Sequence, residues 1–96
     1  MVIRALDIVD RCYSNADGQQ VFEVVYDRLK RGEAVTVSFE GVSTVPSSFV
    51  NTAFITLLDY FPFEKIRRVL TFTKTTPQIN EMIRSRFAFE AQRKPA

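Results

Sequence analysis

Three short segments with strand-like patterns alternate along the chain with three longer segments that have helical periodicity. Residues 34–39 (AVTVSF) place apolar side chains at every second position, which is typical of a strand with one buried face. Residues 2–9 (VIRALDIV) and 67–73 (RRVLTFT) are also rich in strand-forming residues. Because strands that alternate with helices form parallel sheets, the order β-α-β-α-β-α predicts a small α/β domain with a mostly parallel sheet.

The helical segments each have an apolar face. Val21, Val25 and Leu29 recur at intervals of four, and Gly32 is suited to the end of that helix. A helix that opens at Ser47 and ends at Pro62 is apolar over more than one face, so we expect it to be largely buried.

The last predicted helix begins after Thr75 or Thr76, either of which could cap it. Its apolar positions are Ile79, Ile83 and Phe87. We expect one domain over residues 1–92, with a frayed tail over residues 93–96. The strand patterns also make one sheet face more apolar than the other. Either the helices crowd onto one face or the second face is partly covered, in which case it could serve as a homodimer surface.

The composition excludes several classes of enzyme. The 96 residues contain no His, one Cys and three scattered Gly. Ser-His and Cys-His catalytic pairs, imidazole or Cys-based metal sites and an internal disulfide are therefore absent. No phosphate-binding loop or dinucleotide fingerprint occurs. We expect a non-enzymatic protein with no cofactor and no metal, in which Cys12 is an inert small residue.

The charge pattern gives no clear indication of a nucleic-acid partner. The net charge is +2, and bases and acids are interleaved except near the C-terminus, at Arg84, Arg86, Arg93 and Lys94. These four fit the end of a helix better than a nucleic-acid surface. No apolar run is long enough to cross a membrane, and no signal peptide is recognised. A lone Cys fits a reducing compartment, so we expect the cytoplasm.

Function is expected at the edge where the parallel strands end, because ligands and partners of α/β sheets bind there. This edge would gather small polar side chains: Asn15, Asp17, Ser43, Thr44, Ser47, Ser48, Asn51, Lys74 and Thr75. Such a set fits a protein-docking surface. It also fits a small-molecule or nucleotide sensor, in which helix N-termini would hold a phosphate.

Individual residues of this edge have alternative roles. Ser47 could cap the helix that it opens or accept a phosphate. Asn15 or Asp17 could cap the first helix. Asn51 could tie the apolar helix to a neighbouring loop or contact a partner directly, since a buried amide needs hydrogen bonds. Lys74 could contact an anion.

Several motifs together carry a family resemblance that covers nearly the whole chain. These are residues 17–22 (DGQQVF), residues 35–49 (VTVSFEGVSTVPSSF) and Asn51. The chain resembles the STAS-like domains of unknown function, small bacterial and phage-borne relatives of anti-sigma factor antagonists.

The resemblance implies a STAS-like fold and a regulatory role through protein binding. In anti-sigma factor antagonists, a serine after the central strand is phosphorylated by a histidine-kinase-type ATPase, and phosphorylation controls binding. Ser47 falls on that position, with Pro46 in place of the usual acid and Phe49 in place of the glycine. The implied partner is such an ATPase or another regulator.

Overall fold

A parallel sheet of three short strands forms the base of the molecule. The computed structural model describes residues 1–93. Strands β1 (Val2–Arg4), β2 (Val35–Ser38) and β3 (Leu70–Thr73) pair in the order β1-β2-β3. Both pairings are parallel, and Ile3, Val37 and Phe72 lie in register across the sheet. The predicted α/β fold with a parallel sheet is thereby confirmed.

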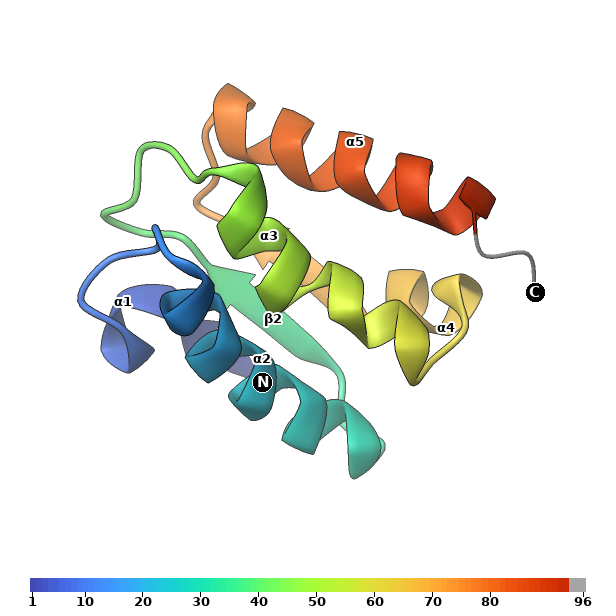
Figure 1. The fold of residues 1–96 in the computed structure, drawn as a ribbon. Coiled ribbons are helices and arrows are strands. Elements are labelled where there is room, and N and C mark those ends of the chain that lie inside the picture. The colour runs from blue at the N-terminus through green and yellow to red at the C-terminus, as the bar shows by residue number, and fades with distance from the viewer. Residues whose placement is uncertain (94–96) are drawn as a thin grey trace.

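The main helices cover one face of this sheet. Helices α2 (Asn15–Lys30), α3 (Ser47–Ala53) and α5 (Pro77–Arg93) lie in front of it in Figure 1. Val35 and Val37 are buried beneath the helices. On the opposite face Val2 is 68% exposed, and the hydroxyls of Thr36 and Thr71 lie 2.7 Å apart. The helices therefore crowd onto one face, the first of the two predicted arrangements.

The predicted apolar helix faces are confirmed. The residues at intervals of four on α2 and α5 are all buried: Val21, Val25 and Leu29 on α2, and Ile79, Ile83 and Phe87 on α5. After α2 the chain turns at Gly32, whose φ of 86° favours glycine. Helix α5 includes Arg93, so the expected frayed tail is left with residues 94–96, which lie outside the described residues.

The predicted first strand is too long. Strand β1 ends at Arg4, and a single helical turn, α1 (Ala5–Ile8), follows it. This turn is closed by a hydrogen bond from Val9 N to Ala5 O, and Arg4 forms an ion pair with Asp7 at 3.1 Å. Ala5 is fully buried. The apolar run therefore continues past the strand because the turn also buries side chains.

The predicted long apolar helix is divided into two pieces. Helix α3 ends at Ala53, and a 3-10 helix, η1 (Ile55–Asp59), follows. At the break, the fully buried Phe54 packs against Phe39, Phe49 and Phe72, with ring centroids 5.0–6.2 Å apart. Phe54 is thus packed into the core at the position where α3 ends and the 3-10 helix begins.

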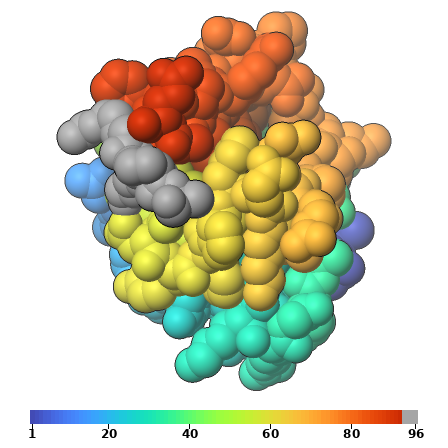
Figure 2. All heavy atoms as spheres, turned by 90° about the vertical axis from the view of Figure 1, so that its right-hand side faces the viewer, coloured from blue at the N-terminus to red at the C-terminus, as the bar shows by residue number. Residues whose placement is uncertain are grey.

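The third strand is shorter than predicted, because a helix precedes it. Pro62 ends the preceding turn and also stands at the N-cap of α4 (Phe63–Val69). Strand β3 therefore begins at Leu70 rather than at Arg67. Helix α4 buries Ile66, and its Phe63 packs against Phe87 of α5 with ring centroids 5.8 Å apart. Figure 2 shows this end of the molecule, where α4 (yellow) adjoins α5 (red).

Candidate functional site

The strands end together at one edge, which gathers the predicted site residues. Arg4, Ser38 and Thr73 are in register at the carboxyl ends of the three strands. We call the segments that follow the recognition edge. It comprises loops 9–14, 39–46 and 74–76 with the first turns of α2 and α3. Eight of the nine predicted site residues fall in these segments: Asn15, Asp17, Ser43, Thr44, Ser47, Ser48, Lys74 and Thr75. The ninth, Asn51, lies beyond them in the second turn of α3.

Helix α2 begins at the recognition edge with a capping box. Its N-cap is Ser14, so the prediction of Asn15 or Asp17 as the cap is wrong. Asp17 N donates to the Ser14 hydroxyl, and Ser14 N donates to the Asp17 carboxylate at 3.0 Å. Tyr13 N donates to the same carboxylate. These hydrogen bonds, that from Ser14 N above all, hold the pKa of Asp17 below its usual range.

Ser47 does not cap the helix that it opens. The N-cap of α3 is Pro46, in an extended conformation, and Ser47 is the first helical residue. A cap needs a side-chain oxygen at the position before the helix, and proline has none, so the capping alternative for Ser47 is wrong. Ser47 is exposed, and its hydroxyl makes no hydrogen bond within the described residues.

The first turns of α2 and α3 touch where Gly18 faces α3. A Cβ built on Gly18 would lie 2.8 Å from Phe49 O and 2.9 Å from Thr52 Cβ. Beside this contact the Thr52 hydroxyl donates to Ser48 O at 3.1 Å and lies 3.4 Å from Asn15 Oδ1. The absence of a side chain at Gly18 thus allows Asn15 and Ser48 to share one surface.

Two residues near the start of α5 hold the loop after β2. Gln78 accepts from Val45 N and donates to Val45 O, both at 2.9 Å. The Thr76 hydroxyl donates to Ser43 O at 2.7 Å and accepts from Ile79 N. Thr76 is therefore the capping residue of the two candidates, and Thr75 is not. No local sequence pattern could predict the link between Gln78 and Val45, because the two lie 33 residues apart.

Asn51 ties α3 to a helix rather than to a loop. Its Oδ1 accepts a 2.8 Å hydrogen bond from Arg86 Nε on α5. Arg86 also forms an ion pair with Glu90 at 3.1 Å, and both side chains are largely buried. The predicted structural role of Asn51 is correct, but the predicted partner is wrong. Arg86 consequently belongs to the packing of α5 and not to a free basic patch.

A hollow of about 230 Å³ lies between the loops after β1 and β2. Ser43 and Thr44 line one side of it, and Arg11 and Tyr13 line another. Cys12 also borders it but is buried. Burial, with the nearby Asp17 carboxylate adding to it, raises the pKa of the Cys12 thiol to about 11. The thiol is thus protonated at neutral pH, as expected of an inert residue.

The part of the recognition edge after β3 has one unusual backbone position. Lys74 is exposed and has a φ of 56°, a left-handed conformation that is uncommon for a residue with a side chain. Thr75 next to it is half-buried.

The recognition edge offers hydroxyls and amides rather than clustered titratable groups. Over residues 1–93, no three His, Cys, Asp or Glu side chains gather as a metal site would require. No described helix is long and apolar enough to cross a membrane. The fold and this edge together define a small α/β module with a polar, hydroxyl-rich surface at the ends of its strands.

A comparison with protein-family models identifies the family to which the chain belongs. The model for the STAS-like domain of unknown function (DUF4325) matches residues 17–80, two thirds of the chain, so the chain belongs to this family. The match runs from the capping box of α2 to the first turn of α5 and so includes the contact at Gly18. Neither the curated proteins nor the solved structures gave a match.

Proposed function

We propose that this protein is a non-enzymatic regulatory module that docks a partner protein through the recognition edge. The proposal rests mainly on the exposure of Ser47 and on its lack of a capping role. The residue is exposed at the start of α3, and its hydroxyl makes no hydrogen bond to any residue between 1 and 93. A kinase or a partner can therefore reach it without unfolding the helix.

The surroundings of Ser47 support docking because they are held in place. The contact at Gly18 fixes α2 against α3, Gln78 fixes the loop that precedes Ser47, and Asn51 fixes α3 to α5. A surface that is ordered before binding loses little conformational entropy when a partner arrives. Ser43 and Thr44, exposed on the same loop, supply further hydrogen-bonding groups.

The resemblance to anti-sigma factor antagonists points to a histidine-kinase-type ATPase as the partner, with Ser47 as its phospho-acceptor. A phosphate there would add a charge of about −2 beside the hydroxyls of Ser43, Thr44 and Ser48, and that charge would alter partner affinity. We place this interaction in the cytoplasm, where a lone reduced cysteine such as Cys12 is usual.

Co-purification from the native host with matched serine variants tests the proposal. Ser47→Glu adds a negative charge at the recognition edge, and Ser85→Glu adds the same charge at an exposed position of α5. We expect a stoichiometric partner with the wild type and with Ser85→Glu, and at least tenfold less of it with Ser47→Glu. Equal recovery with both variants, or no partner with the wild type, would contradict docking at this edge.

The competing proposal is a small-molecule or nucleotide sensor that uses the same edge. The hollow of about 230 Å³ gives it some support but is smaller than the roughly 300 Å³ at which ligand pockets begin. The Asp17 carboxylate also occupies the start of α2, where a phosphate would bind. A nucleotide at 100 times its dissociation constant would add about 2.7 kcal/mol of stability. A thermal-shift panel without any such response would eliminate the sensor.

A further inference from the structure

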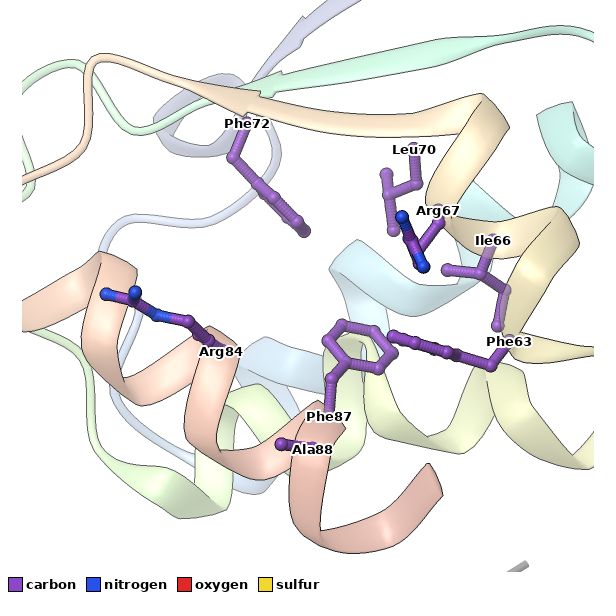
Figure 3. A pocket seen from close by; sticks show the side chains of 8 residues that line it. All are labelled: Phe63, Ile66, Arg67, Leu70, Phe72, Arg84, Phe87 and Ala88. Carbon is purple, nitrogen blue, oxygen red and sulfur yellow. The ribbon is translucent and has the colours of Figure 1, made fainter. Parts of the chain in front are cut away.

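A groove between β3 and α5 lies apart from the recognition edge. Its main cavity holds about 340 Å³. In Figure 3 Phe72 points from β3 toward α5, and Phe87 points back from α5 beside Phe63 of α4. Six residues give it an apolar lining: Phe63, Ile66, Leu70, Phe72, Phe87 and Ala88.

The groove continues along the strand. A second hollow of about 300 Å³ is lined by Phe72, Asn80, Ile83 and Arg84. It shares Phe72 and Arg84 with the main cavity, so the two hollows follow one another between β3 and α5. We call them together the β3–α5 groove. An elongated groove of this kind suits an extended chain.

The outer edge of β3, beside this groove, pairs with no other strand among residues 1–93. Strand β3 is the last in the sheet order. Phe39 N donates to Thr73 O at 3.0 Å, so Thr73 directs its backbone groups toward β2. Because successive residues of a strand direct their backbone groups to opposite sides, the N–H and C=O of Phe72 point away from β2. The four residues of β3 include no charge and no proline, the usual protections of an exposed edge.

Two cations border the groove. Arg67 of α4 and Arg84 of α5 line it, and their side chains are 63% and 74% exposed. Each forms an ion pair with a glutamate of its own helix, at 3.5 Å for Glu64 and 3.2 Å for Glu81. Such exposed pairs are weak, so both guanidinium groups can turn to another carboxylate. A second copy of this chain would bring the same cations to the groove, whereas an acidic partner complements them.

We propose that the β3–α5 groove binds an extended acidic segment of a partner protein as a fourth strand beside β3. The backbone of the segment pairs with Phe72. Since side chains alternate along a strand, every second one enters the groove among the phenylalanines, and the others lie over the open face near Thr71. Acidic residues at the two ends of the segment meet Arg67 and Arg84.

A designed peptide tests this proposal on the full chain. The probe is acetyl-Glu-Thr-Leu-Thr-Leu-Thr-Glu-amide, which places its two leucines and two glutamates on one side of a strand. A second peptide carries N-methyl groups on its three central amides, and a third carries lysine in place of both glutamates. Isothermal titration calorimetry gives the affinities, and amide hydrogen exchange reports on Phe72.

The proposal predicts saturable binding of the probe and at least tenfold slower exchange of the Phe72 amide. N-methylation should weaken binding at least tenfold, and the lysine peptide should bind several-fold more weakly. Arg84→Gln and Ala88→Gln change exposed groove residues and should weaken binding several-fold. Arg31→Gln, which changes the exposed C-cap residue of α2, should not.

Three results would overturn the proposal. Absence of saturable binding would do so, as would equal affinity for the N-methylated peptide, which would mean that the groove takes apolar side chains without strand pairing. Protection of the Phe72 amide that rises with protein concentration in the absence of peptide would assign the groove to a second copy of the chain.

Discussion

Gly18 of α2 and Phe49 of α3 approach so closely that a Cβ on Gly18 would lie 2.8 Å from the Phe49 carbonyl oxygen. This contact sets the distance between the first turns of the two helices, and with it the surface shared by Asn15 and Ser48. The recognition edge therefore depends on a glycine inside a helix, where glycine is otherwise unfavourable.

Replacing Gly18 by alanine tests the close approach, because the contact and helix propensity predict opposite changes in stability. Gly18→Ala would stabilise an open helix position by about 1 kcal/mol. Here we expect it to lower the free energy of unfolding by about 1–3 kcal/mol, because the new methyl group meets backbone atoms of α3. Urea denaturation measures the difference, with Gln20→Ala at an exposed position of α2 as a near-neutral control. A stabilised Gly18→Ala variant would mean that the helices are not in contact.

Ser14 and Ser47 should respond differently to the same substitution. Ser14→Ala removes the N-cap of α2 and should lower the free energy of unfolding by about 1 kcal/mol. Ser47→Ala removes a hydroxyl that has no hydrogen-bond partner in the described part of the chain, and it should change that free energy by less than about 0.5 kcal/mol. Denaturation of both variants under one set of conditions provides the comparison. The reverse order of effects would place the cap of α3 at Ser47.

Asp17 should make stability depend on pH in the acid range. Its pKa is lowered in the folded chain, chiefly by the hydrogen bond from Ser14 N, so the carboxylate stabilises the fold above the pKa of the unfolded chain, about 3.9. This contribution is lost as the pH falls through the lower, folded pKa. The difference in unfolding free energy between the wild type and Asp17→Asn should be constant above about pH 5 and shrink below about pH 4. A difference that grows on acidification would contradict the capping box.

The hydrogen bond between Asn51 and Arg86 should contribute measurably to stability. Asn51→Ala removes the acceptor for Arg86 Nε and should cost about 2 kcal/mol, the range for hydrogen bonds to charged groups. Gln19→Ala breaks an exposed side-chain hydrogen bond to Glu23 and should cost less than about 0.5 kcal/mol. Equal effects in urea denaturation would show that the Asn51 hydrogen bond contributes no more to the free energy of unfolding than an exposed side-chain pair does.

The sequence predicted those parts of the fold that have a simple period. The residues at intervals of four on α2 and α5 are buried as expected, and so are Val35 and Val37 of β2. The alternation in β2 is incomplete, because Ser38 on the other face of the strand is buried as well. The family model also confirms the resemblance that residues 17–22 and 35–49 carry.

The short elements could not be predicted in the same way. One helical turn at Ala5–Ile8 and two turns at Phe63–Val69 are too short to establish a period, and their apolar residues resemble those of the neighbouring strands. The β3–α5 groove could not be predicted either, because α4 supplies part of its lining.

The composition of the recognition edge was predictable, but its contacts were not. Parallel strands must end together, so the sequence could bring the polar loops to one place. The partners of Asn51 and Val45 lie 35 and 33 residues away, and only tertiary packing selects them. The assignment of caps failed by a single position at both Asn15 and Ser47. Ser14 is as suited to the role as Asn15, and α3 begins one residue after Pro46, which has no side-chain oxygen to cap it.

Hydrogen exchange of the purified complex between this protein and its co-purified partner tests docking at the recognition edge most directly. We expect binding to slow exchange in residues 43–52 and 13–18. Ser47→Glu should abolish this protection, and Ser85→Glu should leave it unchanged. Protection confined to β3 and α5, with residues 43–52 exchanging as in the free protein, would contradict docking at the recognition edge and leave only the β3–α5 groove as an interface.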